Sequence, residues 1–152
     1  MLKVGQICPE FSGMDQEGNS INSTKLRGRK FILFFYPKDM TPGCTIEACN
    51  LRDNYEGLKE LGFEIFGVSA DSEKRHQKFI NKFNLPYSLL ADVDRSIINS
   101  FGVWGKKKFM GREFHGILRT TFGIDENGKI LFIIDKVKTK NHSAQILEAL
   151  EK

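Results

Sequence analysis

The sequence predicts an α/β fold in which helices flank a central mixed sheet. KFILFFY (30–36) and FEIFGVS (63–69) are continuous apolar runs, which is typical of strands buried on both faces. Between them, residues 43–61 have helical periodicity, because an apolar stripe falls on one face with Cys44; its members are Ala48, Leu51, Tyr55 and Leu58. Strand, helix and strand at this spacing indicate a right-handed parallel unit.

The remaining elements extend this unit on both sides. We expect an early hairpin at 11–21, a helix at 72–83, a short strand or extended link at 87–92, a short helix at 95–101, strands at 117–125 and 129–135, and a last helix at 143–150. The Asn127-Gly128 pair between the last two strands is a strong hairpin signal. This order predicts one thioredoxin-like domain over residues 1–152, with an N-terminal hairpin extension and an insertion.

Composition excludes several classes of protein. The chain has 152 residues and a net charge of +4, and it contains no apolar run of membrane-spanning length. With no signal peptide visible, we expect a cytoplasmic protein that binds neither membrane nor nucleic acid. The basic cluster Lys106–Lys108, close to Arg112, is interpreted as a solvated loop. Three cysteines in a reducing compartment favour a transient, catalytic disulfide over a structural one.

Cys44 is the first candidate for chemistry. Pro42 suits the first turn of a helix and Thr41 suits its N-cap, so Cys44 falls where free N–H groups favour negative charge. The thiolate, the reactive form of cysteine, is stabilised at such a position. The alternative is a buried structural cysteine, but the residues around Cys44 favour the reactive interpretation.

Cys49 lies five positions further along the same predicted helix. In ideal helix geometry the two Cα atoms would be about 8.6 Å apart, whereas a disulfide needs less than about 7 Å. The two cysteines therefore cannot bridge while the helix is intact. This spacing suits an attacking thiol and a separate resolving thiol that meet only after the first turns unwind.

The stretch PKDMTPGC (37–44) resembles the Pro-x-x-x-Thr-x-x-Cys signature of the peroxiredoxins, and TIEAC (45–49) resembles the Q-type or bacterioferritin-comigratory subfamily. Further similarity lies in VGQICPEF, FGVW, GILRTTFGID and NHSAQILEAL. The resemblance implies a thiol peroxidase that acts on hydrogen peroxide and organic hydroperoxides, with no metal or organic cofactor. It also implies a monomer that thioredoxin or glutaredoxin recycles.

The resemblance also implies roles for single residues. Cys44 would be the peroxidatic cysteine and Cys49 the resolving one, joined in an intramolecular disulfide after local unfolding. Thr41 would hydrogen-bond the peroxide and Pro37 would shield the thiolate from water. Arg119 corresponds to the family's active-site arginine; by strand alternation it projects opposite Leu118 and Thr120, and its cation would stabilise the thiolate and the charge that develops along the O–O bond.

Other candidates carry weaker signals. Glu47 matches the subfamily pattern but can simply complement the helix N-terminus, while Tyr36 and Trp104 are candidate pocket residues that pack equally well as core. Cys8 fits no motif position. The three histidines are isolated and have no recognisable zinc spacing; they are His76, His115 and His142.

Two other functions compete with the peroxidase. A thioredoxin-type oxidoreductase would carry C-x-x-C at the helix start, whereas this chain has C-x-x-x-x-C. A non-enzymatic holdase or binding module would leave Pro37, Thr41 and Arg119 unexplained.

Overall fold

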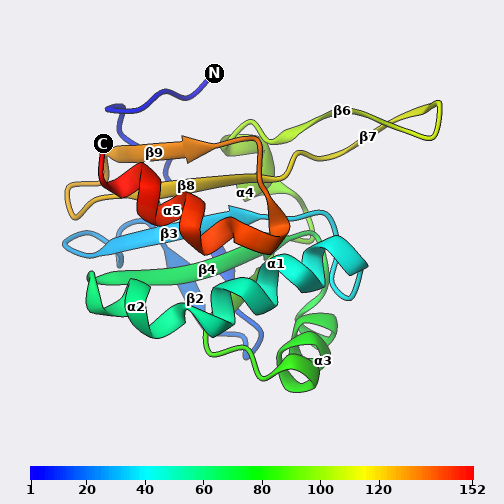
Figure 1. The fold of residues 1–152 in the computed structure, drawn as a ribbon, viewed down its shortest axis with the longest axis horizontal. Coiled ribbons are helices and arrows are strands. Elements are labelled where there is room, and N and C mark those ends of the chain that lie inside the picture. The colour runs from blue at the N-terminus through cyan, green and yellow to red at the C-terminus, as the bar shows by residue number, and fades with distance from the viewer.

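A five-stranded mixed sheet with the strand order β5-β4-β3-β8-β9 forms the centre of the molecule (Figure 1). In the computed structural model, which describes residues 1–152, β3 (Lys30–Phe35) lies between β4 (Phe63–Ser69) and β8 (Thr120–Ile124). It runs parallel to β4 and antiparallel to β8. β5 (Ser88–Ala91) and β9 (Ile130–Ile134) form the two edges. The predicted α/β class with a central mixed sheet is confirmed.

β3 contributes to two hydrophobic cores because successive side chains of a strand point to opposite faces. Ile32 and Phe34 belong to one buried cluster, whereas Leu33 and Phe35 belong to the other. All four are at most 1% exposed. This explains why the sequence of β3 is continuously apolar instead of alternating.

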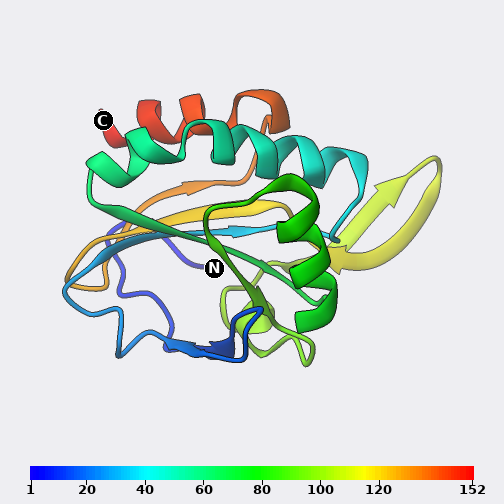
Figure 2. The same ribbon diagram turned by 90° about the horizontal axis from the view of Figure 1, so that it is seen from below.

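The first cluster lies under the helices α1 (Pro42–Asp53), α2 (Tyr55–Glu60), α3 (Glu73–Phe83) and α5 (His142–Leu150). Figure 2 shows α1 and α5 side by side over one face of the sheet. The second cluster is closed by α4 (Ser96–Ser100) and the N-terminal segment, which carries the hairpin β1 (Ser12–Met14) and β2 (Ser20–Asn22). A short 3-10 helix, η1 (Thr139–Asn141), leads into α5.

The expected single helix at 43–61 is in fact two helices that meet at Asn54. The side-chain amide of Asn54 donates a hydrogen bond to the Asn50 carbonyl at 2.9 Å. Such local side-chain bonds compete with the helical ladder, and Asn54 departs from helical geometry with φ −115° and ψ 12°. The prediction of the parallel strand–helix–strand unit is confirmed, but its helix is interrupted.

The basic segment that was interpreted as a loop is a strand. β6 (Trp104–Phe109) and β7 (Arg112–Ile117) pair antiparallel in a hairpin that projects from the body of the molecule (Figure 1). Met110 and Gly111 have positive φ values of 51° and 80°, as a tight two-residue hairpin turn requires. The prediction failed because a hairpin exposed on both sides has no alternation of apolar and polar residues.

The Asn-Gly hairpin is confirmed between β8 and β9, which pair antiparallel. Gly128 has φ 81°, a conformation in which its missing side chain avoids strain. The expected strand 117–125, however, is divided: Ile117 ends β7, Leu118 and Arg119 form a link, and Thr120 begins β8. No helix of the protein has the length and apolar character needed to cross a bilayer.

Candidate active site

The N-terminus of α1 holds Cys44 in a buried position. Thr41 is the N-cap residue and Pro42 begins the helix, both as predicted. Cys44 follows in the first turn, and only 1% of it is exposed. Cys44 therefore lies in the first turn of the helix, where free N–H groups favour negative charge, and its side chain is shielded from bulk water.

Thr41 does not cap α1 with its side chain. Its hydroxyl donates a hydrogen bond to the Lys38 carbonyl at 2.8 Å, and no side-chain cap is formed. Thr41 is thus the N-cap residue by position, as predicted, while its side chain bonds elsewhere. The hydroxyl proton is used within the loop that precedes α1, and the hydroxyl oxygen can still accept a hydrogen bond from a ligand.

Arg119 joins the two acidic groups of the site. One of its guanidinium nitrogens lies 3.4 Å from Cys44 Sγ, and the other donates to Glu47 Oε1 at 2.6 Å. The Arg119 side chain is 23% exposed, so it closes the site and still meets solvent. A side chain at Gly43 would come within 3.3 Å of the guanidinium, which explains why glycine precedes Cys44. Arg119 thus contacts Cys44, but from the link between β7 and β8 and not from the expected strand.

Glu47 is fully buried, and only one of its two carboxylate oxygens has a hydrogen-bond partner. Its Oε1 accepts from Arg119, but Oε2 is the single buried side-chain polar atom without a hydrogen-bond partner. Burial raises the pKa of Glu47 to about 7, although Arg119 opposes the shift. The carboxyl is therefore divided between its neutral and charged forms near neutral pH.

His142, at the start of α5, lies 3.5 Å from that free carboxylate oxygen. It is completely buried, and burial lowers its pKa to about 4. Sequence reasoning treated His142 as isolated, because 95 positions separate it from Glu47. The one available signal was a histidine in the first turn of an apolar helix, where a charged ring would be unfavourable.

A second buried network holds the loop between β3 and α1. The hydroxyl of Tyr36 donates to Asp39 at 2.5 Å, and the other carboxylate oxygen of Asp39 lies 2.6 Å from His76 Nδ1. His76 Nε2 in turn contacts the Leu90 carbonyl at 2.9 Å, and the Asp39 backbone N–H donates to Asp71. Tyr36 is 1% exposed, so its buried, loop-anchoring position favours the core interpretation of this residue.

The other candidate residues make no hydrogen bond to Cys44, and two of them, Cys8 and Trp104, pack with the core cluster on the other face of the sheet. Pro37 is half-buried in the loop that Asp39 anchors. Trp104 receives the Arg95 guanidinium over its ring at 4.3 Å, a packing contact of the cation–π type. Cys8 is buried in the opposite core cluster, and burial raises the pKa of its thiol.

Cys49 lies in the middle of α1 and is half-buried. All three cysteines are free thiols, and α1 is continuous across both Cys44 and Cys49. The adjacent Asn50 ties this part of the helix to the beginning of α5. Its amide donates to the Lys140 carbonyl at 2.9 Å and its oxygen accepts from the Ser143 N–H at 2.8 Å.

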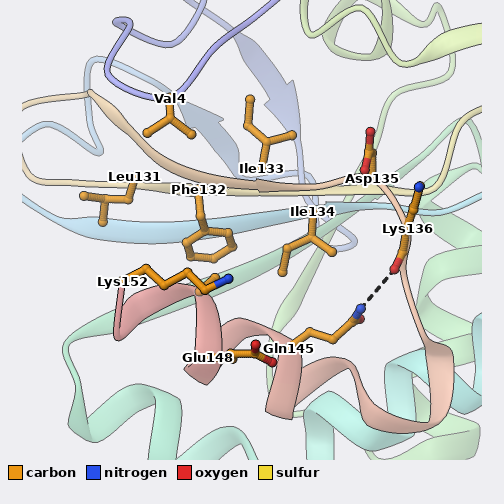
Figure 3. A pocket seen from close by; sticks show the side chains of 11 residues that line it. Val4, Leu131, Phe132, Ile133, Ile134, Asp135, Lys136, Gln145, Glu148 and Lys152 are labelled. Carbon is orange, nitrogen blue, oxygen red and sulfur yellow. Dashed lines mark hydrogen bonds between the residues drawn. The ribbon is translucent and has the colours of Figure 1, made fainter.

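A cavity of about 550 Å³ lies elsewhere, between β9 and α5 (Figure 3). Residues such as Phe132, Ile134 and Glu148 line it, and none of the predicted site residues does. Cys44 and its contacts at the N-terminus of α1 therefore lie outside this cavity.

Comparison with known proteins assigns the family. A model described as the AhpC/TSA family matches residues 4–133. The chain belongs to the AhpC/TSA family. Peroxiredoxin Bcp of Escherichia coli K12 is 45% identical over 150 residues, covering 99% of this chain and 96% of the relative. Peroxiredoxin Bcp of Bacillus subtilis 168 is 43% identical, with the same coverage of both chains.

Solved structures of peroxiredoxins share the fold. Peroxidoxin BcpB from Mycobacterium tuberculosis superposes with a TM-score of 0.86 at 33% identity, covering 99% of this chain and 97% of that one. Xanthomonas campestris peroxiredoxin Q also gives 0.86, at 31% identity and with 93% and 89% covered. The chain is thus a peroxiredoxin of the Bcp type, with the thioredoxin-like fold expected from its sequence. As a peroxiredoxin it is a thiol peroxidase, an antioxidant oxidoreductase that takes a hydroperoxide and a thioredoxin-type reductant.

Proposed function

We propose that Cys44 is the peroxidatic cysteine of this thiol peroxidase. The observation that carries the proposal is the contact between Cys44 Sγ and Arg119 at 3.4 Å, inside a site where only 1% of the cysteine is exposed. A fixed cation beside a desolvated sulfur favours the thiolate and supplies positive charge where the O–O bond breaks. The substrates are hydrogen peroxide and organic hydroperoxides.

In the first step the Cys44 thiolate attacks the terminal oxygen of the peroxide. An S–O bond forms and the O–O bond breaks, so sulfur is oxidised to the sulfenic acid and the peroxide leaves as hydroxide or alkoxide, which takes up a proton from solvent. Thr41 Oγ1 accepts a hydrogen bond from the bound peroxide, and Arg119 stabilises the leaving oxygen. Pro37 shields the sulfur from water, and Trp104 is a candidate to contribute to the pocket.

In the second step the first turns of α1 unwind, and the Cys49 thiol attacks the sulfenic sulfur. An S–S bond forms and water leaves. Thioredoxin, or glutaredoxin in its place, then reduces the disulfide by thiol exchange. We propose that the protein does this as a single-domain monomer in the cytoplasm, where its thiols are returned to the reduced state.

The test is hydroperoxide consumption coupled to thioredoxin and its NADPH-dependent reductase. Cys44→Ser should abolish turnover, because no other thiol lies at the Arg119 guanidinium. Retained turnover in Cys44→Ser would overturn the proposal.

The companion variant, Cys49→Ser, should reduce one equivalent of peroxide and then stop, because its sulfenic acid has no resolving thiol. Cys8→Ser is the matched control and should turn over at the wild-type rate. Peptide mapping of the oxidised wild type should show a Cys44–Cys49 bond, and a bond to Cys8 would refute the assignment of the resolving cysteine.

A further inference from the structure

The tautomer of His142 is fixed by its neighbour Gln145. The Gln145 amide nitrogen donates to the Lys136 carbonyl at 2.9 Å (Figure 3), so its oxygen is the atom that accepts from the Lys138 N–H. The same oxygen lies 2.9 Å from His142 Nδ1. Because a carbonyl oxygen can only accept, Nδ1 must carry the proton and Nε2 of the neutral ring must be an acceptor.

The acceptor side of His142 faces the unsatisfied oxygen of Glu47. Thr121 Oγ1 lies 2.7 Å from Nε2 and donates its proton there, so the hydroxyl is also unavailable to the carboxylate. Glu47 Oε2 and His142 Nε2 are 3.5 Å apart, which is longer than a hydrogen bond and typical of two acceptors in contact. An ionised Glu47 therefore has no hydrogen-bond donor at Oε2. If protonated, it no longer brings a buried charge against an acceptor, and its O–H points at the ring nitrogen whose lone pair it shares with the Thr121 hydroxyl.

We propose that His142 is a positioning residue that holds Glu47 as a neutral carboxylic acid, so that loss of one proton from Glu47 switches the net charge that Arg119 presents to Cys44. This inference rests on the proposed role of Cys44. With Glu47 neutral, the guanidinium charge is directed at the sulfur. With Glu47 ionised, an anion 2.6 Å from Arg119 cancels that charge and disfavours the thiolate.

The groups that face Glu47 support a switch near neutral pH. Cys44 of α1 and Arg119 lie on one side, and His142 of α5 lies on the other. Tyr87, which precedes β5, is buried and neutral, because burial and Glu47 both raise its pKa. Lys107 of β6 adds positive charge near Arg119, although burial lowers its pKa. Burial itself raises the pKa of Glu47 to about 7, which places the switch near neutral pH.

The test is the rate of the first oxidation of Cys44 by hydrogen peroxide, measured in a single turnover without reductant from about pH 5 to about pH 9. In the wild type the rate should fall as Glu47 ionises. Glu47→Gln keeps the acceptor for Arg119 and gives His142 Nε2 a donor, so it mimics the protonated state. Its rate should not fall, and above pH 8 it should exceed the wild type by roughly threefold to tenfold.

A second variant separates positioning from packing. His142→Gln offers Glu47 Oε2 an N–H donor and should hold Glu47 ionised, giving a low rate at all pH values and no falling limb. Adding Glu47→Gln should restore the rate, which a purely structural defect at His142 would not allow. His115→Gln, on the exposed hairpin, is the matched control and should keep the wild-type profile.

Infrared spectroscopy tests the same point without kinetics. The wild type should show a protonated carboxyl band at about pH 6 that is lost by about pH 8 and is absent from Glu47→Gln. A falling limb that persists in Glu47→Gln, or a wild type without this band, would overturn the inference. Neither result bears on Cys44 itself, whose role fails only if Cys44→Ser remains active.

Discussion

Two buried histidine–carboxylate pairs stand beside α1, and they differ in how fully their hydrogen bonds are met. Asp39 and His76, at 2.6 Å, have a partner for every polar atom, including the Tyr36 hydroxyl and the Leu90 carbonyl. Glu47 and His142, at 3.5 Å, leave one carboxylate oxygen unmatched. All four side chains are at most 1% exposed, so the difference does not come from solvent.

The comparison shows that a buried carboxylate and a buried imidazole can have different roles in one protein. A satisfied buried pair rigidifies its surroundings, and the Asp39 pair fixes the loop from which Pro37 and Thr41 project. An unsatisfied pair stores an unfavourable interaction that a single proton removes. The unsatisfied pair is the one in contact with Arg119, which is where a change of charge affects the sulfur.

The largest effect is expected from breaking the satisfied pair. His76→Ala leaves the Asp39 carboxylate buried without its ring partner, which should lower the free energy of unfolding by about 3–5 kcal/mol. Urea unfolding at neutral pH measures this, with His115→Ala as the exposed control. A loss equal to that of the control would show that the Asp39 pair does not hold the loop.

The next effect comes from relieving the unsatisfied pair. Glu47 has a folded-state pKa raised to about 7 from 4.5, so its contribution to stability is full below pH 4.5 and is lost as the pH rises through 7. Glu47→Gln has no carboxyl to ionise and therefore does not lose stability as the pH rises through about 7. The free energy of unfolding of Glu47→Gln minus that of the wild type should therefore increase from pH 4.5 to above pH 7, by about 3 kcal/mol in total.

His142 acts in the opposite direction, because its pKa is lowered to about 4 from 6.5. Its contribution is full above pH 6.5 and is lost as the pH falls toward 4. In the wild type the two slopes cancel between about pH 4.5 and 6.5, since folding transfers one proton from the imidazole to the carboxyl. Chemical denaturation of the wild type and Glu47→Gln at several pH values tests both statements. A difference in unfolding free energy between these two proteins that does not change with pH would contradict them.

The smallest effect is expected from Thr121→Val. The valine frees the lone pair of His142 Nε2, so the Glu47 proton gains a better acceptor and is held to higher pH. The falling limb of the oxidation rate should move to higher pH by less than about one unit. The loss of one buried hydrogen bond should cost about 1 kcal/mol of unfolding free energy. A limb that moves to lower pH would mean that the hydroxyl serves Glu47 and not His142.

The sequence predicted what local chemistry determines. The helix start at Pro42, the buried strand 30–36 and the Asn-Gly turn each depend on near neighbours in the chain, and all three are confirmed. The convergence of Arg119 on Cys44 was predicted from a motif, although the residue lies in a link and not in a strand.

The pairs of buried charges were not predictable. His142 and Glu47 come together only because α5 packs beside α1, and neither periodicity nor spacing encodes that contact. The same holds for Asp39 and His76, which are 37 positions apart on a loop and on α3. The break at Asn54 was not predicted because the apolar pattern is continuous there, and a single side-chain hydrogen bond accompanies the interruption.

The attachment of Asn50 to the start of α5 has a kinetic consequence for the proposed cycle. These hydrogen bonds anchor residue 50, which follows the segment that we propose unwinds, and the two sulfurs stay on a tether of five residues. Short tethers give effective concentrations of about millimolar or more. In the proposed cycle this tether lets Cys49 compete with a second peroxide for the sulfenic acid, which limits the irreversible oxidation of Cys44.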